Sequence, residues 1–286
     1  MDLDREQESQ NIEDRRGRRV SRGVAGGGIG TLIIILLALF FGFDPRMLLQ
    51  GNVQEANYPQ GPPPQSQQTG TNDEMREFVA RVLGSTERTW DEIFQAGGQT
   101  YQKPTLVLFS DAVESACGYG QAAAGPFYCG ADQKLYIDLS FYRELRERFR
   151  ASGDFAQAYV IAHEVGHHVQ NLLGIMRKVQ SLQSRSSERE ANALSVRLEL
   201  QADCLAGIWA NHANRERGIL EQGDIEEGLN AAAQIGDDRM QRRAQGYVVP
   251  EGFTHGSAEQ RVQWFRRGIQ SGDLKQCDTF SRGPLS

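Results

Sequence analysis

Hydrophobic and polar positions along the chain switch between helical and strand spacing, and this pattern predicts a mostly helical domain with a small sheet. From Asp73 onward, apolar residues recur every three or four positions as far as Gly97 and Gly98, which indicates a first helix or helix pair. Residues 103–109 end in the apolar run 106–109 and are typical of a buried strand, and residues 134–138 alternate as a short strand does. Further helices are predicted at about residues 141–150, 154–174, 186–212, 224–243 and 257–268. The predicted fold class is α+β.

The predicted helix at residues 154–174 is apolar on nearly every face up to Val165, so we expect it to be buried. Asp154 suits its N-cap and Gly174 suits the position after its end. Inside it lie His163, Glu164 and His167, in the spacing HExxH. Positions i and i+4 share a helix face, so both imidazoles can reach one metal ion while Glu164 stays near its open coordination site. Because burial of three ionisable groups is costly unless they are paired or metal-bound, the pattern predicts the metal site of a zinc hydrolase.

Catalytic zinc usually takes three protein ligands and keeps a fourth position for water, so a third ligand must come from elsewhere. Glu199 and Asp203 lie four residues apart in the predicted helix at residues 186–212. We expect Glu199 to bind the metal and Asp203 to accept a hydrogen bond from the second nitrogen of a ligand histidine. Glu190 is the alternative ligand. The competing interpretation is that these acids belong to a solvated helix face.

These residues resemble known motifs. HExxH followed by a helix with ExxAD is similar to the glutamate-liganded zincins. Taken together, five segments resemble the bacterial neutral zinc metallopeptidase family: ACGYG (116–120), GPFYC (125–129), HEVGHH (163–168), ELQADC (199–204) and FTHGS (253–257). The resemblance covers about residues 101–280 and implies a zincin-like metallopeptidase without fixing a substrate. By analogy with zincins, it also implies that the strand at residues 134–138 offers an open edge to an extended peptide.

The chemistry that follows is hydrolysis of peptide bonds with one Zn²⁺ ion as cofactor and Glu164 as general base. His255 is the candidate donor to the oxyanion, and Tyr247 is the second choice. Two other classes stay open. A catalytically silent, zinc-stabilised scaffold would keep His163, His167 and Glu199 and bind envelope or membrane partners. An adaptor without metal would bind no zinc at all.

The N-terminal region predicts a membrane anchor. Residues 24–43 are twenty residues without a charge, a length that suits one helical crossing of a bilayer. Five arginines precede this run at positions 15, 16, 18, 19 and 22, which favours a cytoplasmic N-terminus. A cleavable signal peptide is the alternative. Glycines spaced as GxxxG at the start of the run could pair two such helices, so a homo-oligomer also stays open.

We therefore expect a cytoplasmic tail at residues 1–22, a single transmembrane anchor at 23–43, a Pro/Gln-rich linker at 44–71 and the metallopeptidase domain at 72–286. The expected location is the bacterial inner membrane, with the catalytic domain facing the periplasm. A net charge of -6 argues against nucleic acid as a partner, which leaves a peptide or protein substrate and the lipid bilayer.

Four cysteines in a segment that is expected to lie outside the cytoplasm can form two disulfides. Cys117 and Cys129 bracket a short loop rich in Gly and Ala, which leaves Cys204 and Cys277 as a second pair. Three connectivities exist in principle. Zinc ligation by cysteine and a free buried thiol at Cys204 are the alternatives.

Overall fold

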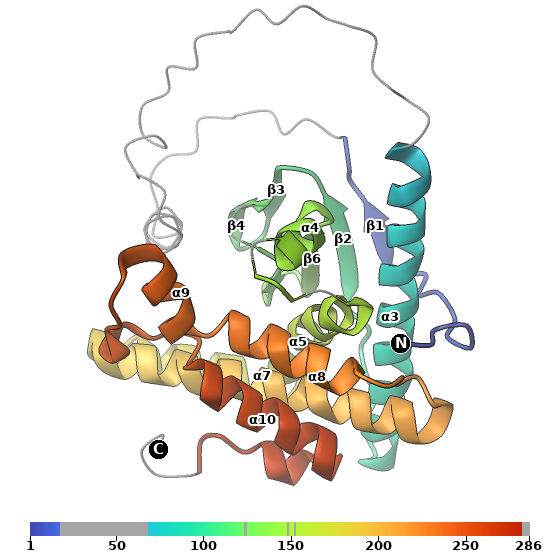
Figure 1. Cartoon of the computed structure of the whole chain (residues 1–286). Helices are drawn as coiled ribbons and strands as arrows, with labels where there is room; N and C mark the ends of the chain where they lie inside the picture. The colour runs from blue at the N-terminus through green and yellow to red at the C-terminus, as the bar shows by residue number, and fades with distance from the viewer. Residues whose placement is uncertain (18–67, 123–124, 148, 152, 282–286) are drawn as a thin grey trace, which may run out of the picture.

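The computed structural model describes residues 1–17, 68–122, 125–147, 149–151 and 153–281. The central element is helix α5 (Asp154–Leu172), which lies between a small sheet and a layer of helices (Figure 1). That layer contains α7 (Glu188–Arg217), α8 (Asp224–Gln234) and α10 (Ala258–Ser271). The long helix α3 (Gln68–Ala96) packs across both α5 and α7. The predicted α+β class is confirmed.

The sheet has the strand order β1-β2-β6-β5. Strand β2 (Thr105–Phe109) runs parallel to both β1 (Ile12–Asp14) and β6 (Lys134–Asp138), and β5 (Phe127–Cys129) runs antiparallel to β6. The β6 strand matches the predicted range, but it lies inside the sheet. The expectation that residues 134–138 form an open edge is therefore wrong, because β6 pairs with β2 on one side and with β5 on the other.

A hairpin of β3 (Ala112–Ser115) and β4 (Gly118–Gln121) forms a separate two-stranded sheet. The disulfide Cys117–Cys129 joins this hairpin to β5, and the disulfide Cys204–Cys277 joins α7 to the short 3₁₀ turn η3 (Leu274–Cys277). Both predicted pairs are confirmed, and the alternatives of a free Cys204 thiol and of cysteine ligands to zinc do not apply.

The helices differ from the predicted ranges mainly at their ends. Residues 141–150 contribute α4 (Ser140–Glu147), and residues 224–243 form two helices, α8 and α9 (Asp237–Gln245). Three short helical elements were not predicted, α6 (Ile175–Gln183), the 3₁₀ turn η2 (Pro250–Gly252) and η3, and neither were the strands β1, β3, β4 and β5. Gly174 has the positive φ of 73° expected after the end of α5. The N-cap of α5 is Gly153 rather than Asp154, which is the first helical residue.

Helix α10 packs very closely against α7, and two glycines make this contact possible. A Cβ atom at Gly207 would lie 2.3 Å from the Phe265 carbonyl oxygen, and one at Gly268 would lie 2.0 Å from that of Cys204. Any side chain at either position would force the helices apart. The contact matters because α10 carries Arg261, which lies in the site described below.

The N-terminal residues 1–17 lie on the domain, where they supply β1, whereas the sequence predicted a separate tail and a domain that begins at residue 72 (Figure 1). The predicted anchor at residues 23–43 falls outside the described residues. Within the described part of the chain, no helix has the length and apolar character needed to cross a membrane.

Candidate metal centre

Three side chains from two helices converge beneath the sheet. Helix α5 supplies His163 and His167 one turn apart, and α7 supplies Glu199. The Glu199 carboxylate lies 3.1 Å from His163 Nε2 and 3.4 Å from His167 Nε2. Zinc–ligand bonds of about 2.0–2.1 Å at tetrahedral angles place two ligand atoms about 3.3 Å apart. These residues therefore fit a zinc ion, both in donor type and in spacing.

Both imidazoles are held so that Nε2 faces the centre, because each Nδ1 has a hydrogen-bond acceptor of its own. His163 Nδ1 lies 2.9 Å from Asp203 Oδ1, as the sequence predicted. His167 Nδ1 lies 2.9 Å from Gln170 Oε1. The Gln170 amide donates to the Leu198 carbonyl at 2.8 Å, so its oxygen is the atom left for the histidine. This arrangement selects the tautomer that leaves Nε2 free for a metal.

Asp203 lies in a buried network that the sequence did not indicate. Arg261 donates to its carboxylate from Nε and from Nη2, each at 2.9 Å, and the Tyr159 hydroxyl donates to the same group. Asp203 has no exposed side-chain surface, and that of Arg261 is 2% exposed. Arg261 comes from α10, 58 positions along the chain from Asp203. Only the folded chain brings this cation to the site.

Gly166, the fourth residue of the HEVGH motif, allows α5 and α7 to approach. A Cβ atom there would lie 2.9 Å from the Ala202 carbonyl oxygen and 3.1 Å from Ala202 Cα. Ala202 lies almost one turn beyond Glu199 on the same helix. The absence of a side chain at Gly166 therefore brings the Glu199 carboxylate within reach of the two histidines.

The loop before α10 presents His255 to the same cavity as the three candidate ligands. Its Nδ1 lies 3.2 Å from Oδ1 of the fully buried Asp237. Oδ2 of Asp237 accepts three main-chain N–H groups, from Thr254 at 2.8 Å, His255 at 2.6 Å and Gly256 at 2.9 Å. Asp237 thus fixes both the loop and the imidazole. Nothing in the local sequence distinguishes it from an ordinary acid at a helix start.

The three candidate ligands line a cavity of about 430 Å³, a volume that can hold a small ligand or part of a peptide. Glu164, His255 and Arg261 line it together with the three candidate ligands. Its remaining wall is largely apolar, with contributions from Phe127, Tyr128, Phe141, Met176, Leu198, Ile235 and Met240.

The electrostatics of the cavity suit metal binding and proton transfer. Burial lowers the pKa of the His163 imidazole, but the carboxylates of Asp203 and Glu199 outweigh this effect and raise the pKa to about 10. Burial acts to raise the pKa of Glu199, yet the two histidines hold that pKa well below its usual range, so this ligand is ionised. Burial raises the pKa of Glu164 against the opposing effect of the same histidines, which moves it toward the range of a useful proton carrier.

The alternative residues lie elsewhere. Glu190 is exposed and forms the capping box of α7 with Ser187. The side chain of Tyr247 is 61% exposed and is not among the residues that line the cavity. A second acidic group, Asp154 with Asp224 and Glu227, also has its oxygen atoms close together, but the Met1 amine lies 2.8 Å from Asp154 and 3.4 Å from Asp224.

The comparisons with known proteins agree with this geometry. Residues 1–280 match the family described as "Putative neutral zinc metallopeptidase". The relative "Uncharacterized protein YpfJ" of Escherichia coli (strain K12) is 48% identical over an alignment of 290 residues, and the match covers 96% of this chain and 97% of the relative. "Uncharacterized protein Rv2575" of Mycobacterium tuberculosis (strain H37Rv) is 38% identical over 258 residues, which cover 87% of this chain and 86% of the relative. No solved structure matches significantly.

Proposed function

We propose that this chain, which belongs to the neutral zinc metallopeptidase family, is a zinc-dependent endopeptidase with Glu164 as its general base. The observation that carries the proposal is the spacing of the Glu199 oxygens from the two Nε2 atoms, 3.1 Å and 3.4 Å, with each histidine fixed by a second hydrogen bond. A site of this kind, with three protein ligands and an adjoining cavity, is typical of catalytic rather than structural zinc.

Zinc held by these three residues would supply a Lewis acid that activates water and polarises the scissile carbonyl. Glu164 accepts the proton of the attacking water and passes it to the leaving amine. Burial raises its pKa, which favours this exchange. His255, which lines the same cavity, donates to the oxygen of the carbonyl as negative charge develops there.

The position and charge of His255 suit this role. Burial lowers its pKa, but the hydrogen bond to Asp237 and the charge of Glu199 outweigh that effect and raise the pKa above its ordinary value. The raised pKa favours the protonated imidazole, whose positive charge stabilises an oxyanion. Asp237 acts as a positioning residue because it holds the ring and three amides of the loop.

Strand β5 is the proposed binding edge for the substrate. It ends the strand order of the described sheet, and its residues Phe127 and Tyr128 line the cavity. An extended peptide can add to such an edge through main-chain hydrogen bonds. Phe127 is itself stacked on Tyr136 of β6, at 4.8 Å between ring centroids. Because the cavity wall beyond this edge is largely apolar, we expect the substrates to be unfolded segments with apolar side chains beside the scissile bond.

The proposed location is the bacterial inner membrane, with the metal centre outside the cytoplasm. The uncharged residues 24–43 support the membrane attachment. The two disulfides support an oxidising compartment for the domain.

The test uses the purified full chain, because residues 1–17 are part of the folded domain. We would measure zinc content and cleavage of an unstructured peptide library for the wild type, Glu164→Gln and the control Glu188→Gln, which changes an exposed acid at the start of α7. The expected result is one zinc per chain in all three and a loss of cleavage of roughly 10²–10⁴-fold in Glu164→Gln alone. Zinc binding without any cleavage by the wild type would favour the silent scaffold. The absence of bound zinc would refute both the zinc peptidase and the zinc-stabilised scaffold.

A further inference from the structure

Residues 1–17 are joined to the domain by main-chain hydrogen bonds as well as by side chains. Residues Ile12, Glu13 and Asp14 of β1 pair in register with Leu106, Val107 and Leu108 of β2. The Leu106 N–H donates to the Asn11 carbonyl at 2.8 Å, and the Arg15 N–H donates to the Leu108 carbonyl at 2.8 Å. The first seventeen residues thus complete the sheet that lies over the metal helix.

Side chains of the same segment are buried in the domain. Leu3 belongs to the main hydrophobic core, with 9% of its surface exposed. The buried Glu6 forms an ion pair of 2.6 Å with Arg217 at the end of α7. Ser9 and Asn11 both donate to Glu87 of α3, at 2.7 Å and 2.8 Å. Polar groups buried in pairs from two parts of a chain are costly to separate, because each would lose its partner.

Helix α3 contains a glycine at the point where the segment crosses it. A Cβ atom at Gly84 would lie 2.0 Å from the Gln7 carbonyl oxygen and 3.2 Å from the Ser9 nitrogen, and the three nearest atoms all belong to the segment. Glycine in a helix interior is normally unfavourable. Here it makes room for the N-terminal residues.

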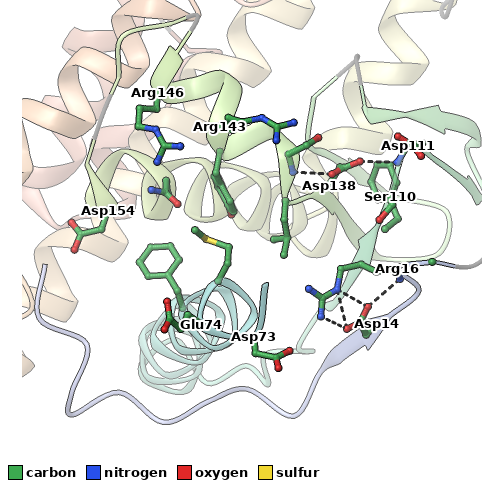
Figure 2. A pocket seen from close by; sticks show the side chains of 18 residues that line it. Asp14, Arg16, Asp73, Glu74, Ser110, Asp111, Asp138, Arg143, Arg146 and Asp154 are labelled. Carbon is green, nitrogen blue, oxygen red and sulfur yellow. Dashed lines mark hydrogen bonds and ion pairs between the residues drawn. The ribbon is translucent and has the colours of Figure 1, made fainter. Parts of the chain in front are cut away.

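The described residues on the two sides of 18–67 lie at the same end of the domain. The carboxyl end of β1 and the amino end of α3 lie side by side there (Figure 1). Figure 2 shows Asp14 and Arg16 of the segment bound to one another beside a cavity of about 1110 Å³, which Asp73 and Glu74 of α3 also line. The described residues that flank 18–67 are therefore close together at one end of the domain.

We infer that residues 1–17 occupy the same compartment as the metal centre, so the chain does not make a single membrane crossing between residues 18 and 67. Strand pairing and a shared core cannot form across a bilayer, so the number of crossings must be even. The uncharged run at residues 24–43 has the length for one helical crossing and not for two. The polar residues 58–70, rich in proline and glutamine, cannot supply the second one. The apolar run then attaches the domain to one face of the membrane.

Two further observations bear on this topology, which replaces the expected cytoplasmic tail. Arg15 is bound to Glu13 and Arg16 to Asp14, so two of the five arginines that suggested a cytoplasmic N-terminus carry a neutralising partner. The family match begins at residue 1 and so includes the docked segment. The two disulfides favour an oxidising compartment for the segment and the domain alike.

Labelling in spheroplasts that express the full chain tests the topology. Asp4→Cys places a thiol on an exposed position of the segment, and Glu188→Cys places one on an exposed position of the domain. The four native cysteines are all in disulfides and should not react. Reaction of both variants with a membrane-impermeant maleimide before lysis supports the proposal and the extracytoplasmic location. Protection of both until lysis supports the shared compartment but places it inside. Reaction of Glu188→Cys alone overturns the proposal.

The sign of a stability change provides an independent test on the purified full chain. If the segment is docked, Gly84→Ala forces it away from α3 and lowers the Tm, and adding Glu6→Ala lowers the Tm by less than the sum of the two single effects. If the segment is elsewhere, alanine improves the helix and the Tm rises. A raised Tm for Gly84→Ala would overturn the proposal even if labelling were ambiguous.

Discussion

Replacing Asp203 by asparagine should separate the stability of the buried network from its role in metal binding. The Asp203 carboxylate is fully buried and accepts from His163 at 2.9 Å and from two nitrogens of Arg261 at 2.9 Å. Asparagine has the same shape but carries no charge. Asp203→Asn therefore leaves the 2%-exposed guanidinium of Arg261 without the anion that it binds through two hydrogen bonds.

Breaking a buried ion pair by neutralising one partner typically costs about 3–5 kcal/mol. For a domain of this size, each kcal/mol lowers the Tm by about 2–4 °C, so we expect a drop of roughly 6–20 °C. The loss of the negative acceptor at His163 Nδ1 should also weaken zinc binding by about 10–100-fold.

A second substitution distinguishes the two effects. Arg261→Met, added to Asp203→Asn, removes the stranded charge and keeps an apolar side chain of similar length, so much of the lost stability should return. Zinc affinity should stay low, because His163 still lacks its anionic acceptor.

Thermal unfolding in the presence of chelator measures stability, and competition with a chromophoric chelator measures zinc affinity. Equal Tm values for Asp203→Asn and the double variant would show that the unpaired charge of Arg261 is not what destabilises Asp203→Asn. Wild-type zinc affinity in Asp203→Asn would refute the orienting role assigned to this carboxylate.

Four further predictions concern catalysis, zinc binding and pH dependence. His255→Gln should lower kcat by about 10²–10³-fold with zinc content unchanged, as measured by steady-state kinetics, and an unchanged kcat would exclude this donor. Gln170→Leu should reduce zinc affinity by about 10–100-fold, since His167 loses the acceptor of its Nδ1 proton; equal affinities in chelator competition would contradict this. Because the pKa of His163 in the metal-free protein is raised to about 10, zinc must displace a proton at lower pH, so affinity should rise with pH up to about 10, by up to tenfold per unit. The metal-free protein should also become less stable as the pH rises from about 6.5 to 10, because the folded state binds the His163 proton more tightly than the unfolded state and this advantage is lost with the proton. A zinc affinity independent of pH would refute the raised pKa of His163.

The local part of the site could be predicted from the sequence because helix geometry is short-range. Spacing i and i+4 places His163 and His167 on one face, and the structure finds their Nε2 atoms together. Glu199 and Asp203 could be paired with them by the same spacing on a second helix. Strand β6 and the end of α5 before Gly174 followed from apolar runs and from a glycine position in the same way.

The residues that sequence reasoning missed reach the site from distant segments. Gln170 is a polar residue in a buried helix, and only contact with the Leu198 carbonyl shows which way its amide points. Asp237 and Arg261 resemble ordinary surface residues of α9 and α10 in the sequence, yet both are buried. Strand β5 has three residues, too few for an alternating pattern, and its pairing with β6 reversed the expected edge.

The N-terminal segment shows the same difference between what local sequence predicts and what long-range packing decides. Composition determined an uncharged run long enough for one membrane crossing, because length and hydropathy are properties of the local chain. Only the tertiary structure decided that the residues before that run pair with β2 and fill the space above Gly84. Helical spacing fixes which side chains share a face within a few residues. Which distant strand, cation or terminus closes the site depends on long-range packing, where each contact is specified by its partner.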